Sequence, residues 1–252
     1  MYNPLDLTGK RVLVTGASSG IGRATAVVLS RLGARLILNG RRADALQETL
    51  AATENSTIHL CSAFDLANLD EIPKWVAELV GGGGAPLDGA VHCAGALNHI
   101  PLRTVSSANI DSMMVPNLHA ALMLLRAVSA RNVAAATGVS VVLISSAAAL
   151  VASPGMAAYS ASKMALYAVA RAAAKELAAK RVRVNCIAPA YVKTPMLDHA
   201  AGSIMDFERI EEQQFLGIID PEEVGVMAAY LLSEAAQSIT GSQFVMDGGF
   251  TL

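Results

Sequence analysis

Thr15-Gly16-Ala17-Ser18-Ser19-Gly20-Ile21-Gly22 is the stretch that decides the fold of this 252-residue chain. An apolar run, Arg11–Val14, precedes it, and a segment with helical periodicity, Ile21–Leu32, follows at once. Glycines admit backbone conformations closed to other residues and let a pyrophosphate approach the positive end of a helix. By glycine spacing alone, a tight turn without a ligand is the simpler reading of G-x-x-x-G-x-G, but the strand before it and the helix after it favour nucleotide binding.

Outward from this turn, short apolar runs alternate with longer helical segments along the whole chain. The runs are typical of strands buried on both faces of a sheet, and they lie at Arg11–Val14, Arg35–Leu38, Thr57–Cys61, Ala90–Cys93, Val139–Ile144, Val182–Ile187 and Gln243–Met246. The helical segments are Ile21–Leu32, Ala43–Ala52, Leu69–Val80, Ala108–Ala136, Ala157–Ala179 and Pro221–Glu234. Because parallel strands need crossover connections, this alternation predicts an α/β, doubly wound Rossmann-type fold, with a seven-stranded parallel sheet and helices on both faces.

The length favours a single domain over residues 1–252, since α/β domains often reach this size undivided. The glycines at 81–84 separate a helix from the next strand by only four residues, so we read them as a surface loop. Residues 191–219 contain no clear strand, and their apolar side chains include Met196, Leu197, Ile204, Met205, Phe207 and Phe215. We expect this segment to be a lid over an apolar ligand; a pair of packing helices without a gating role is the alternative.

Composition excludes several classes of protein. The formal charge of −2 is spread over both signs, which removes the basic footprint of a nucleic-acid-binding protein. The three cysteines, Cys61, Cys93 and Cys186, are odd in number and lack metal-ligand spacing, so we expect reduced thiols and no metal site. The N-terminal residues do not resemble a signal peptide, and no apolar run is long enough to span a bilayer, so a cytoplasmic protein without a membrane partner is expected.

The end of the second predicted strand carries Arg41 and Arg42. They stand about twenty residues past the glycines, where an NAD-binding domain would place a carboxylate against the adenosine ribose. A guanidinium suits a phosphate, so we expect Arg41, supported by Arg42, to hold the 2′-phosphate of NADP(H). An exposed arginine pair that merely begins a helix is the alternative. Asp65, after the third strand, is a candidate partner for the adenine amino group, or a simple cap.

A serine, a tyrosine and a lysine form the candidate catalytic group. Tyr159 and Lys163 are four residues apart in an alanine-rich segment, so they project from one face of a helix. A nearby ammonium favours the phenolate and is expected to lower the pKa of Tyr159, which makes Tyr159 a candidate general acid and base. Ser145 and Ser146 end the predicted strand Val139–Ile144, where a hydroxyl can polarise a substrate carbonyl.

These residues resemble the short-chain dehydrogenase/reductase family over essentially the whole chain. The matching pieces are TGASSGIG at 15–22, HCAG at 92–95, Asn117, Ser146, YSASK at 159–163, APA at 188–190 and DGG at 247–249. The overall pattern is similar to 3-oxoacyl-thioester reductases and broad ketone reductases. The resemblance implies hydride transfer between NADP(H) and a carbonyl or secondary alcohol.

The resemblance also implies roles for individual residues. Tyr159 would move the proton, Lys163 would bind the nicotinamide ribose, and Ser146, in preference to Ser145, would orient the carbonyl. Asn117 would hold a water that links the lysine to solvent, and Thr194 would contact the nicotinamide carboxamide. The full set of cofactor contacts expected is Gly16, Ser18, Ser19, Gly20, Ile21, Gly22, Arg41, Arg42, Asp65, Leu66, Ala94, Gly95, Tyr159, Lys163, Pro189, Val192 and Thr194.

Three positions depart from the family pattern. His92 and Cys93 replace the usual two asparagines before Ala-Gly, and we expect a structural variation without loss of activity. Pro116 precedes Asn117 inside a predicted helix and is expected to remove a hydrogen bond and kink the axis. Ser19 stands where many NADP(H)-preferring members carry a basic residue, so Arg41 carries most of the preference for NADP(H).

The motifs and the family resemblance together predict an enzymatic function and an oligomeric state. The first hypothesis is an NADP(H)-dependent carbonyl reductase or alcohol dehydrogenase, whose apolar lid favours a hydrophobic ketone or 3-oxoacyl substrate. A non-catalytic NADP-binding sensor or scaffold and a sugar-nucleotide epimerase or dehydratase are the alternatives. His99 and His199 are candidate contacts to a polar substrate group. Family precedent predicts a homotetramer built on the two longest helices, with Ala168, Ala172 and Ala173 allowing close approach.

Overall fold

The computed structural model describes residues 3–81, 84–151, 153–197 and 212–252. Seven parallel strands form one sheet in the order β3-β2-β1-β4-β5-β6-β7, which confirms the predicted doubly wound architecture. The strands are β1 (Arg11–Thr15), β2 (Arg35–Gly40), β3 (Leu60–Ala63), β4 (Gly89–His92), β5 (Val139–Ile144), β6 (Val182–Pro189) and β7 (Gln243–Met246). The order reverses between β1 and β4, and such a switch point opens a crevice at the carboxyl ends of the strands.

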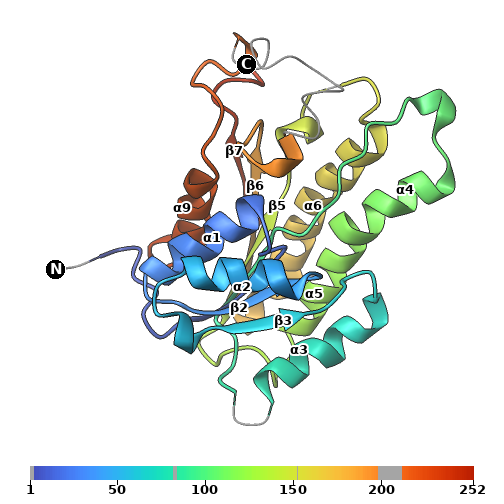
Figure 1. Cartoon of the computed structure of the whole chain (residues 1–252). Coiled ribbons are helices and arrows are strands. Elements are labelled where there is room, and N and C mark those ends of the chain that lie inside the picture. Colours follow the sequence, from blue (N-terminus) through green and yellow to red (C-terminus); the bar gives the residue numbers. More distant parts are fainter. Residues whose placement is uncertain (1–2, 82–83, 152, 198–211) are drawn as a thin grey trace.

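Helices cover both faces of this sheet (Figure 1). One layer contains α1 (Gly20–Arg31), α2 (Ala43–Ala52) and α9 (Pro221–Leu232). The other contains α3 (Ile72–Val80), α5 (Ala120–Val128) and α6 (Ala157–Glu176), with α4 (Ser107–Met114) leading into α5. The two-sided cover explains why the strands read as continuous apolar runs instead of alternating ones.

Alternate side chains of β1 pack into the hydrophobic cores on the two faces of the sheet. Leu13 packs with the layer of α3, α5 and α6, while Val12 and Val14 pack with the layer of α1, α2 and α9. All three are essentially inaccessible to solvent, as alternation along a doubly covered strand requires. The glycine turn is therefore anchored by a strand that cannot shift without disturbing both cores.

The long helix predicted over Ala108–Ala136 differs from the observed structure in two ways. Residues Val115–His119 form a π-helical turn between α4 and α5, because Pro116 has no N–H to continue the α-helical ladder. The helix then ends at Val128, since the backbone of residues 133–135 pairs with Leu87 instead. The predicted kink at Pro116 is therefore present as a π-helical turn.

The third strand begins later than predicted. Residues Ser56–Ile58 form a 3₁₀ turn after Asn55, which has a positive φ of 53°, and β3 starts only at Leu60. Within the described residues, no helix is both long and apolar enough to cross a membrane.

Candidate active site

The glycine turn between β1 and α1 has three positions that disfavour a side chain, through steric contact or a positive φ. Gly16 has a φ of +65°, and a Cβ there would lie 2.6 Å from the Ala94 amide nitrogen. Gly20 has a φ of +51°, and its Cβ would lie 3.2 Å from Cγ2 of Thr194. A Cβ on Gly22 would collide with the Gly16 carbonyl oxygen. This bare backbone at the start of α1 fits the pyrophosphate of a dinucleotide, which needs close approach to main-chain N–H groups.

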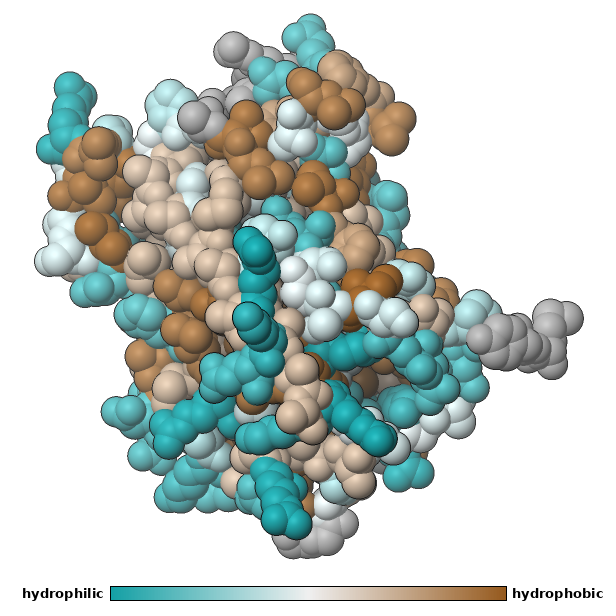
Figure 2. Space-filling model, turned by 180° about the vertical axis from the view of Figure 1, so that it is seen from behind, coloured by the Kyte–Doolittle hydropathy of each residue, from teal (hydrophilic) through white to brown (hydrophobic). Residues whose placement is uncertain are grey.

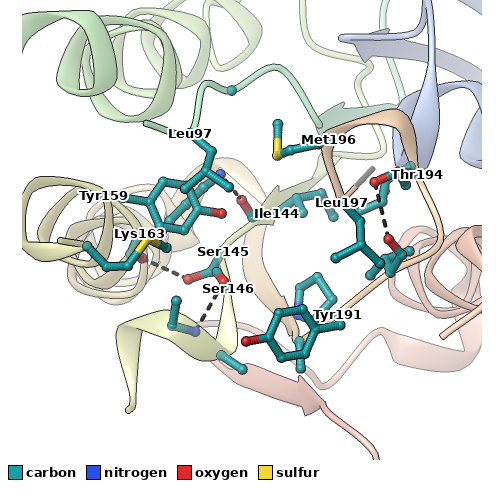
Figure 3. A pocket seen from close by; sticks show the side chains of 18 of the residues that line it. Leu97, Ile144, Ser145, Ser146, Tyr159, Lys163, Tyr191, Thr194, Met196 and Leu197 are labelled. Atoms are coloured by element: carbon teal, nitrogen blue, oxygen red, sulfur yellow. Dashed lines mark hydrogen bonds between the residues drawn. The ribbon is translucent and has the colours of Figure 1, made fainter. Parts of the chain in front are cut away.

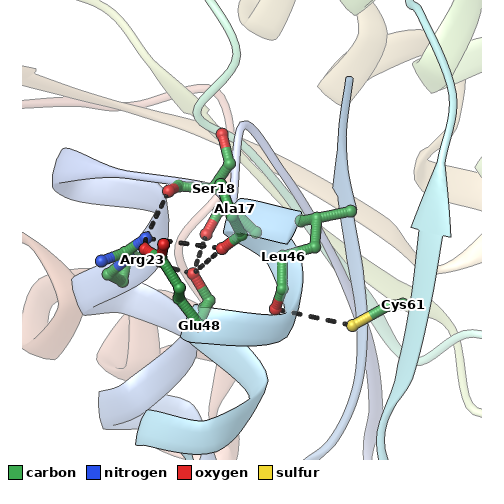
Figure 4. A network of polar contacts seen from close by, with 8 residues as sticks. Ala17, Ser18, Arg23, Leu46, Glu48 and Cys61 are labelled. Carbon is green, nitrogen blue, oxygen red and sulfur yellow. Dashed lines mark hydrogen bonds and ion pairs between the residues drawn. The ribbon is translucent and has the colours of Figure 1, made fainter. Parts of the chain in front are cut away.

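A polar network behind the turn orients its peptide groups (Figure 4). Arg23 of α1 donates from Nη2 to the Ser18 carbonyl at 2.8 Å and to Glu48 of α2 at 2.8 Å, and from Nε to the Thr49 hydroxyl at 3.0 Å. Thr49 in turn donates to the Ala17 carbonyl at 2.8 Å. Because C=O and N–H of a trans peptide point in opposite directions, these bonds direct the two following N–H groups away from α2. The sequence motif identified the turn but not this network.

The end of β2 adjoins the glycine turn. A Cβ on Gly40 would lie 3.3 Å from the Ser18 side chain, so the two segments are in contact. Arg41 and Arg42 follow and are exposed, and Arg42 occupies the N-cap position of α2. Among the described residues neither arginine makes an ion pair, so both guanidinium groups are available to a phosphate at the mouth of the crevice.

In the loop after β3, Asp65 makes a capping contact, and its contact with an adenine amino group stays a prediction. Its carboxylate accepts a hydrogen bond from the Ala67 N–H at 3.0 Å, which is the capping role, and the side chain is exposed. Leu66 is buried in the core.

A cavity of about 470 Å³ opens beside the glycine turn, at the carboxyl ends of the strands. The predicted cofactor residues that line it are Ile21, Gly95, Tyr159, Lys163, Pro189, Val192 and Thr194. The Tyr159 hydroxyl points into the cavity, with Leu97 and Met196 on one side and Tyr191 on the other (Figure 3). The structure thus brings the central predicted residues together, whereas Arg41, Arg42, Asp65 and Leu66 lie outside the cavity at the ends of β2 and β3.

The two serines that end β5 have different surroundings. Ser145 donates its hydroxyl to the Lys163 carbonyl at 2.8 Å and so ties β5 to α6. Ser146 accepts a hydrogen bond from the Ala148 N–H at 3.1 Å and lies within hydrogen-bond reach of the Tyr159 hydroxyl. Of the pair, Ser146 is therefore the serine beside the tyrosine, and its role in orienting the substrate carbonyl stays a prediction.

The sequence predicts that Lys163 lowers the pKa of Tyr159, but in the structure this pKa is raised. Burial raises the pKa of Tyr159 above its ordinary value, although the hydrogen bond with Ser146 works in the opposite direction. The Lys163 ammonium lies 5.8 Å from the ring centroid and donates to the Ile144 carbonyl at 2.9 Å. Its charge is directed at a backbone oxygen, so in this structure the phenol stays protonated.

Lys163 itself is poorly solvated. Burial lowers its pKa to about 8, while the Cys93 and Cys186 thiols oppose this shift. Burial also raises the pKa of each of these thiols to about 12, which fits the expectation of inert, reduced cysteines. Among the cavity groups whose pKa is shifted, Lys163 is therefore the one whose charge changes closest to neutral pH.

Asn117 connects the loop after β4 with the helix that carries Tyr159. It is fully buried in the π-helical turn. Its Oδ1 accepts from the Ala96 N–H at 2.8 Å, and its Nδ2 donates to the Ala96 carbonyl at 3.0 Å and to the Ser162 hydroxyl at 2.9 Å. Ser162 donates to the Tyr159 carbonyl at 2.7 Å. The sequence analysis missed Ser162, although its place inside the YSASK pentad was a usable signal.

The wall opposite the catalytic group was also largely missed. Leu97, Met156, Tyr191 and Phe250 line the cavity from four separate segments. Tyr191 and Phe250 contact edge to face, with ring centroids 5.3 Å apart. Asp247 of the DGG motif accepts bonds from the N–H groups two and four residues further on, which shapes the C-terminal turn that presents Phe250.

The predicted lid is described only at its two ends. Val192 forms a parallel bridge with Ile219, and the buried Gln214 side chain bonds to both the N–H and the carbonyl of Tyr191. Met196 and Leu197 line the cavity, while Phe215 is exposed. His199, Ile204, Met205 and Phe207 lie outside the described residues.

Comparison with known proteins agrees with this geometry. A family model described as enoyl-(acyl carrier protein) reductase matches residues 16–251. The chain is 32% identical to the 3-oxoacyl-[acyl-carrier-protein] reductase FabG of Rickettsia prowazekii, over 98% of this chain and 99% of that protein. It is 34% identical to D-threitol dehydrogenase of Mycolicibacterium smegmatis, over 98% and 94% of the two chains. A solved structure from Beutenbergia cavernae, with NADP bound at low occupancy, has a TM-score of 0.89 and 31% identity over 98% of this chain and 99% of that one.

The fold and the site define an oxidoreductase that binds a nicotinamide dinucleotide and acts on a small molecule. The chain belongs to the short-chain dehydrogenase/reductase family, as its motifs predicted.

Proposed function

We propose that the protein is an NADP(H)-dependent reductase of apolar ketones or 3-oxoacyl compounds. The observation that carries the proposal is the Tyr159 hydroxyl, which points into an apolar cavity that reaches the glycine turn. A protonated phenol in that position is a general acid for a carbonyl oxygen. When bound, the nicotinamide supplies the hydride that adds to the carbonyl carbon.

Residues of the chain orient the carbonyl, transfer the proton and stabilise the resulting phenolate. Ser146 donates a hydrogen bond to the substrate oxygen and holds it beside Tyr159. Tyr159 gives its proton to that oxygen as negative charge develops there, which leaves an alcohol and a phenolate. The Lys163 ammonium stabilises the phenolate, and its release from the Ile144 carbonyl is the movement this role requires. Asn117 keeps the Ala96 backbone and α6 in register during these steps.

The preference for NADP(H) rests on Arg41. Its exposed guanidinium follows β2 next to the glycine turn, and no acidic residue stands at 39–42 to favour an unmodified ribose. Arg42 is the second donor. Ser18, Ser19 and Ile21 complete the contacts proposed along the pyrophosphate, while Asp65, Leu66 and Ala94 lie toward the adenine and the middle of the dinucleotide.

The substrate class follows from the composition of the wall. Leu97, Met156, Met196, Leu197 and Phe250 present hydrocarbon and thioether surface, which binds an acyl or alkyl chain better than a polyol. Among the described lining residues, Lys163 and His99 are the ionisable groups besides tyrosines and Cys93, so no carboxylate is available to bind sugar hydroxyls.

The experiment is a cofactor and substrate matrix. Oxidation of NADPH and NADH is followed with the purified protein against alkyl and aryl ketones, 3-oxoacyl thioesters and, in the reverse direction, polyols, with Tyr159→Phe beside it. NADPH-selective turnover of the apolar compounds that is lost in the variant supports the proposal. Preference for polyols would contradict the substrate class, and NADPH binding without turnover of any compound would favour a sensor.

We also propose that the protein assembles as a homotetramer through its long helices. Ala168 and Ala172 are exposed on α6 next to Met164, which is 41% exposed, whereas Ala173 packs inward against the core. In the view from behind, apolar side chains are most frequent in the upper half of the molecule and hydrophilic ones gather below (Figure 2). Exposed apolar surface of this kind is commonly buried between subunits.

Sedimentation analysis tests the assembly. The wild-type protein is expected at four times the chain mass, and Ala168→Arg, which places a charge on the contact face of α6, is expected to sediment as a smaller species. A wild-type monomer would contradict the proposal.

A further inference from the structure

His92 is a buried histidine beneath the active site that the mechanism above does not use. It ends β4, is 1% exposed, and replaces the first asparagine of the family pattern. Its Nδ1 lies 2.9 Å from the Thr15 hydroxyl at the end of β1, and its Nε2 lies 3.2 Å from the Pro116 carbonyl. The ring therefore joins the strand before the glycine turn to the π-helical turn that carries Asn117.

The direction of each hydrogen bond follows from the chemistry of the partners. A carbonyl only accepts, so Nε2 must carry the hydrogen that binds Pro116. Burial and the nearby Lys163 charge lower the pKa of His92 to about 4, so the ring is uncharged at neutral pH and Nδ1 accepts from Thr15. The Thr15 oxygen accepts in turn from the Ala94 N–H at 3.3 Å. The result is a directed chain from Ala94 through Thr15 and His92 to Pro116.

The π-helical turn explains why the Pro116 carbonyl needs this donor. In an α-helix that carbonyl would accept from the Ala120 N–H, but Ala120 bonds instead to the Val115 carbonyl. This partly buried carbonyl has lost its α-helical partner, and the imidazole supplies a hydrogen bond in its place. His92 thereby stabilises the turn at the residue next to Asn117.

The backbone between Ala94 and Ala96 is consequently held at both ends. Ala94 is fixed through Thr15, and Ala96 is fixed by the Asn117 side chain. Gly95 between them lies against the catalytic lysine, since a Cβ there would stand 2.8 Å from Asn117 Oδ1 and 3.3 Å from Lys163 Nζ. Any shift of the 94–96 backbone would therefore change its distance from the Lys163 ammonium group.

We propose that His92 is a positioning residue for proton transfer: its imidazole holds the Thr15 hydroxyl and the Pro116 carbonyl at a fixed separation, and so fixes Asn117 and the 94–96 backbone against Lys163. The inference rests on the proposed function, because it concerns the proton-transfer step of that reaction. His92 does not itself line the substrate cavity, so we expect its effect to be on kcat.

Variants that keep one half of the bridge test the proposal. His92→Gln places an amide donor near Nε2 and retains the bond to Pro116, whereas His92→Asn keeps only an acceptor for Thr15, and His92→Leu removes both. We expect His92→Leu and His92→Asn to lower kcat about tenfold, as for the loss of one orienting buried hydrogen bond, with KM and NADPH affinity little changed. His92→Gln should recover most of this loss.

The pH profile of kcat gives a readout that a merely structural role would not move. The titratable groups that face Lys163 are His92, Cys93, Cys186 and Tyr159, and among these five groups only Lys163 changes charge near pH 8. We expect the basic limb of the profile to move in His92→Leu and to return in His92→Gln. Equal kcat and equal profiles in wild type and His92→Leu, or a glutamine variant no better than leucine, would overturn the proposal.

Two further measurements keep the test decisive. If His92→Leu does not fold, Thr15→Val against Thr15→Ser removes or keeps the hydroxyl that the bridge needs, and equal kcat for these two would count against it. If the wild-type protein turns over no compound, the proposed function has failed. Amide hydrogen exchange at residues 115–121 then decides on His92 separately, because it should rise in His92→Leu and not in His92→Gln.

Discussion

The phosphate cradle and the substrate wall of this protein are built in opposite ways. The cradle is one continuous stretch, residues 15–22, whose shape comes from backbone conformations and the absence of side chains. The wall takes Leu97, Met156, Tyr191 and Phe250 from segments far apart in the chain, and its shape comes from how those side chains pack. A change in the cradle should therefore weaken cofactor binding, whereas a change in the wall should alter which substrate is preferred.

The largest effect is expected where the two regions meet. Tyr159→Phe removes the proton donor and should lower kcat by about 10²–10⁴-fold while NADPH still binds, because the phenyl ring keeps the shape of the cavity. Steady-state kinetics combined with fluorescence titration of NADPH measures both quantities. Retained turnover would show that the cavity does not use this hydroxyl.

The cradle should not tolerate a single methyl group. Gly16→Ala introduces a Cβ 2.6 Å from the Ala94 nitrogen at a φ of +65°, so NADPH affinity should fall by tenfold or more, about 1.4 kcal/mol. Gly9→Ala is the matched control, because Gly9 has a φ of +80° but nothing within 4 Å of a Cβ. It should lower the melting temperature through backbone strain alone and leave NADPH binding intact, as calorimetry would report.

The choice between NADP(H) and NAD(H) should depend on an exposed charge. Arg41→Ala should weaken NADPH binding by about 10–100-fold, the range for charge-assisted hydrogen bonds to one phosphate, and change NADH binding far less. Arg42→Ala is expected to have the smaller effect. Equal losses for the two cofactors would place the 2′-phosphate elsewhere.

The wall should affect selectivity and leave the cofactor alone. Phe250→Ala removes an aromatic ring from the cavity and should raise KM for a long-chain ketone about fivefold, which corresponds to about 1 kcal/mol, with little change for acetone-sized compounds. Leu252→Ala, at a fully exposed position, is the control and should change neither. A fall in NADPH affinity in Phe250→Ala would mean that the wall and the cradle are coupled.

The smallest effect concerns stability against pH. The folded pKa of Lys163, about 8, lies below its unfolded value, so the cost of burying its charge is fully present below pH 8 and is relieved as pH rises. Between about pH 8 and 9 the cofactor-free protein should therefore gain up to about 1 kcal/mol relative to Lys163→Met. Above pH 9 the Cys93 and Cys186 thiols act in the opposite direction, because their folded pKa is raised to about 12. Urea denaturation of both proteins at pH 7.5 and 9 measures the difference.

Periodicity and motifs were sufficient for the architecture and for the cofactor side of the cavity, but not for its opposite wall. Apolar runs and helical segments predicted all seven strands, and their misses were at element ends, such as β3 and the end of α5. Those ends are set by tertiary contacts, for example the pairing of residues 133–135 with Leu87, which no local pattern records.

The sequence by itself predicted which residues would carry the chemistry, because glycine turns, helical spacing and strand ends are local properties of the backbone. Only the tertiary structure decided how those residues are supported. The Arg23 network behind the cradle, the Asn117 contacts with Ala96 and Ser162, and the His92 bridge all join segments separated by 20 residues or more, apart from the bond from Arg23 to Ser18. It also decided the protonated state of Tyr159, since burial depends on the whole fold while the spacing to Lys163 depends on one helix.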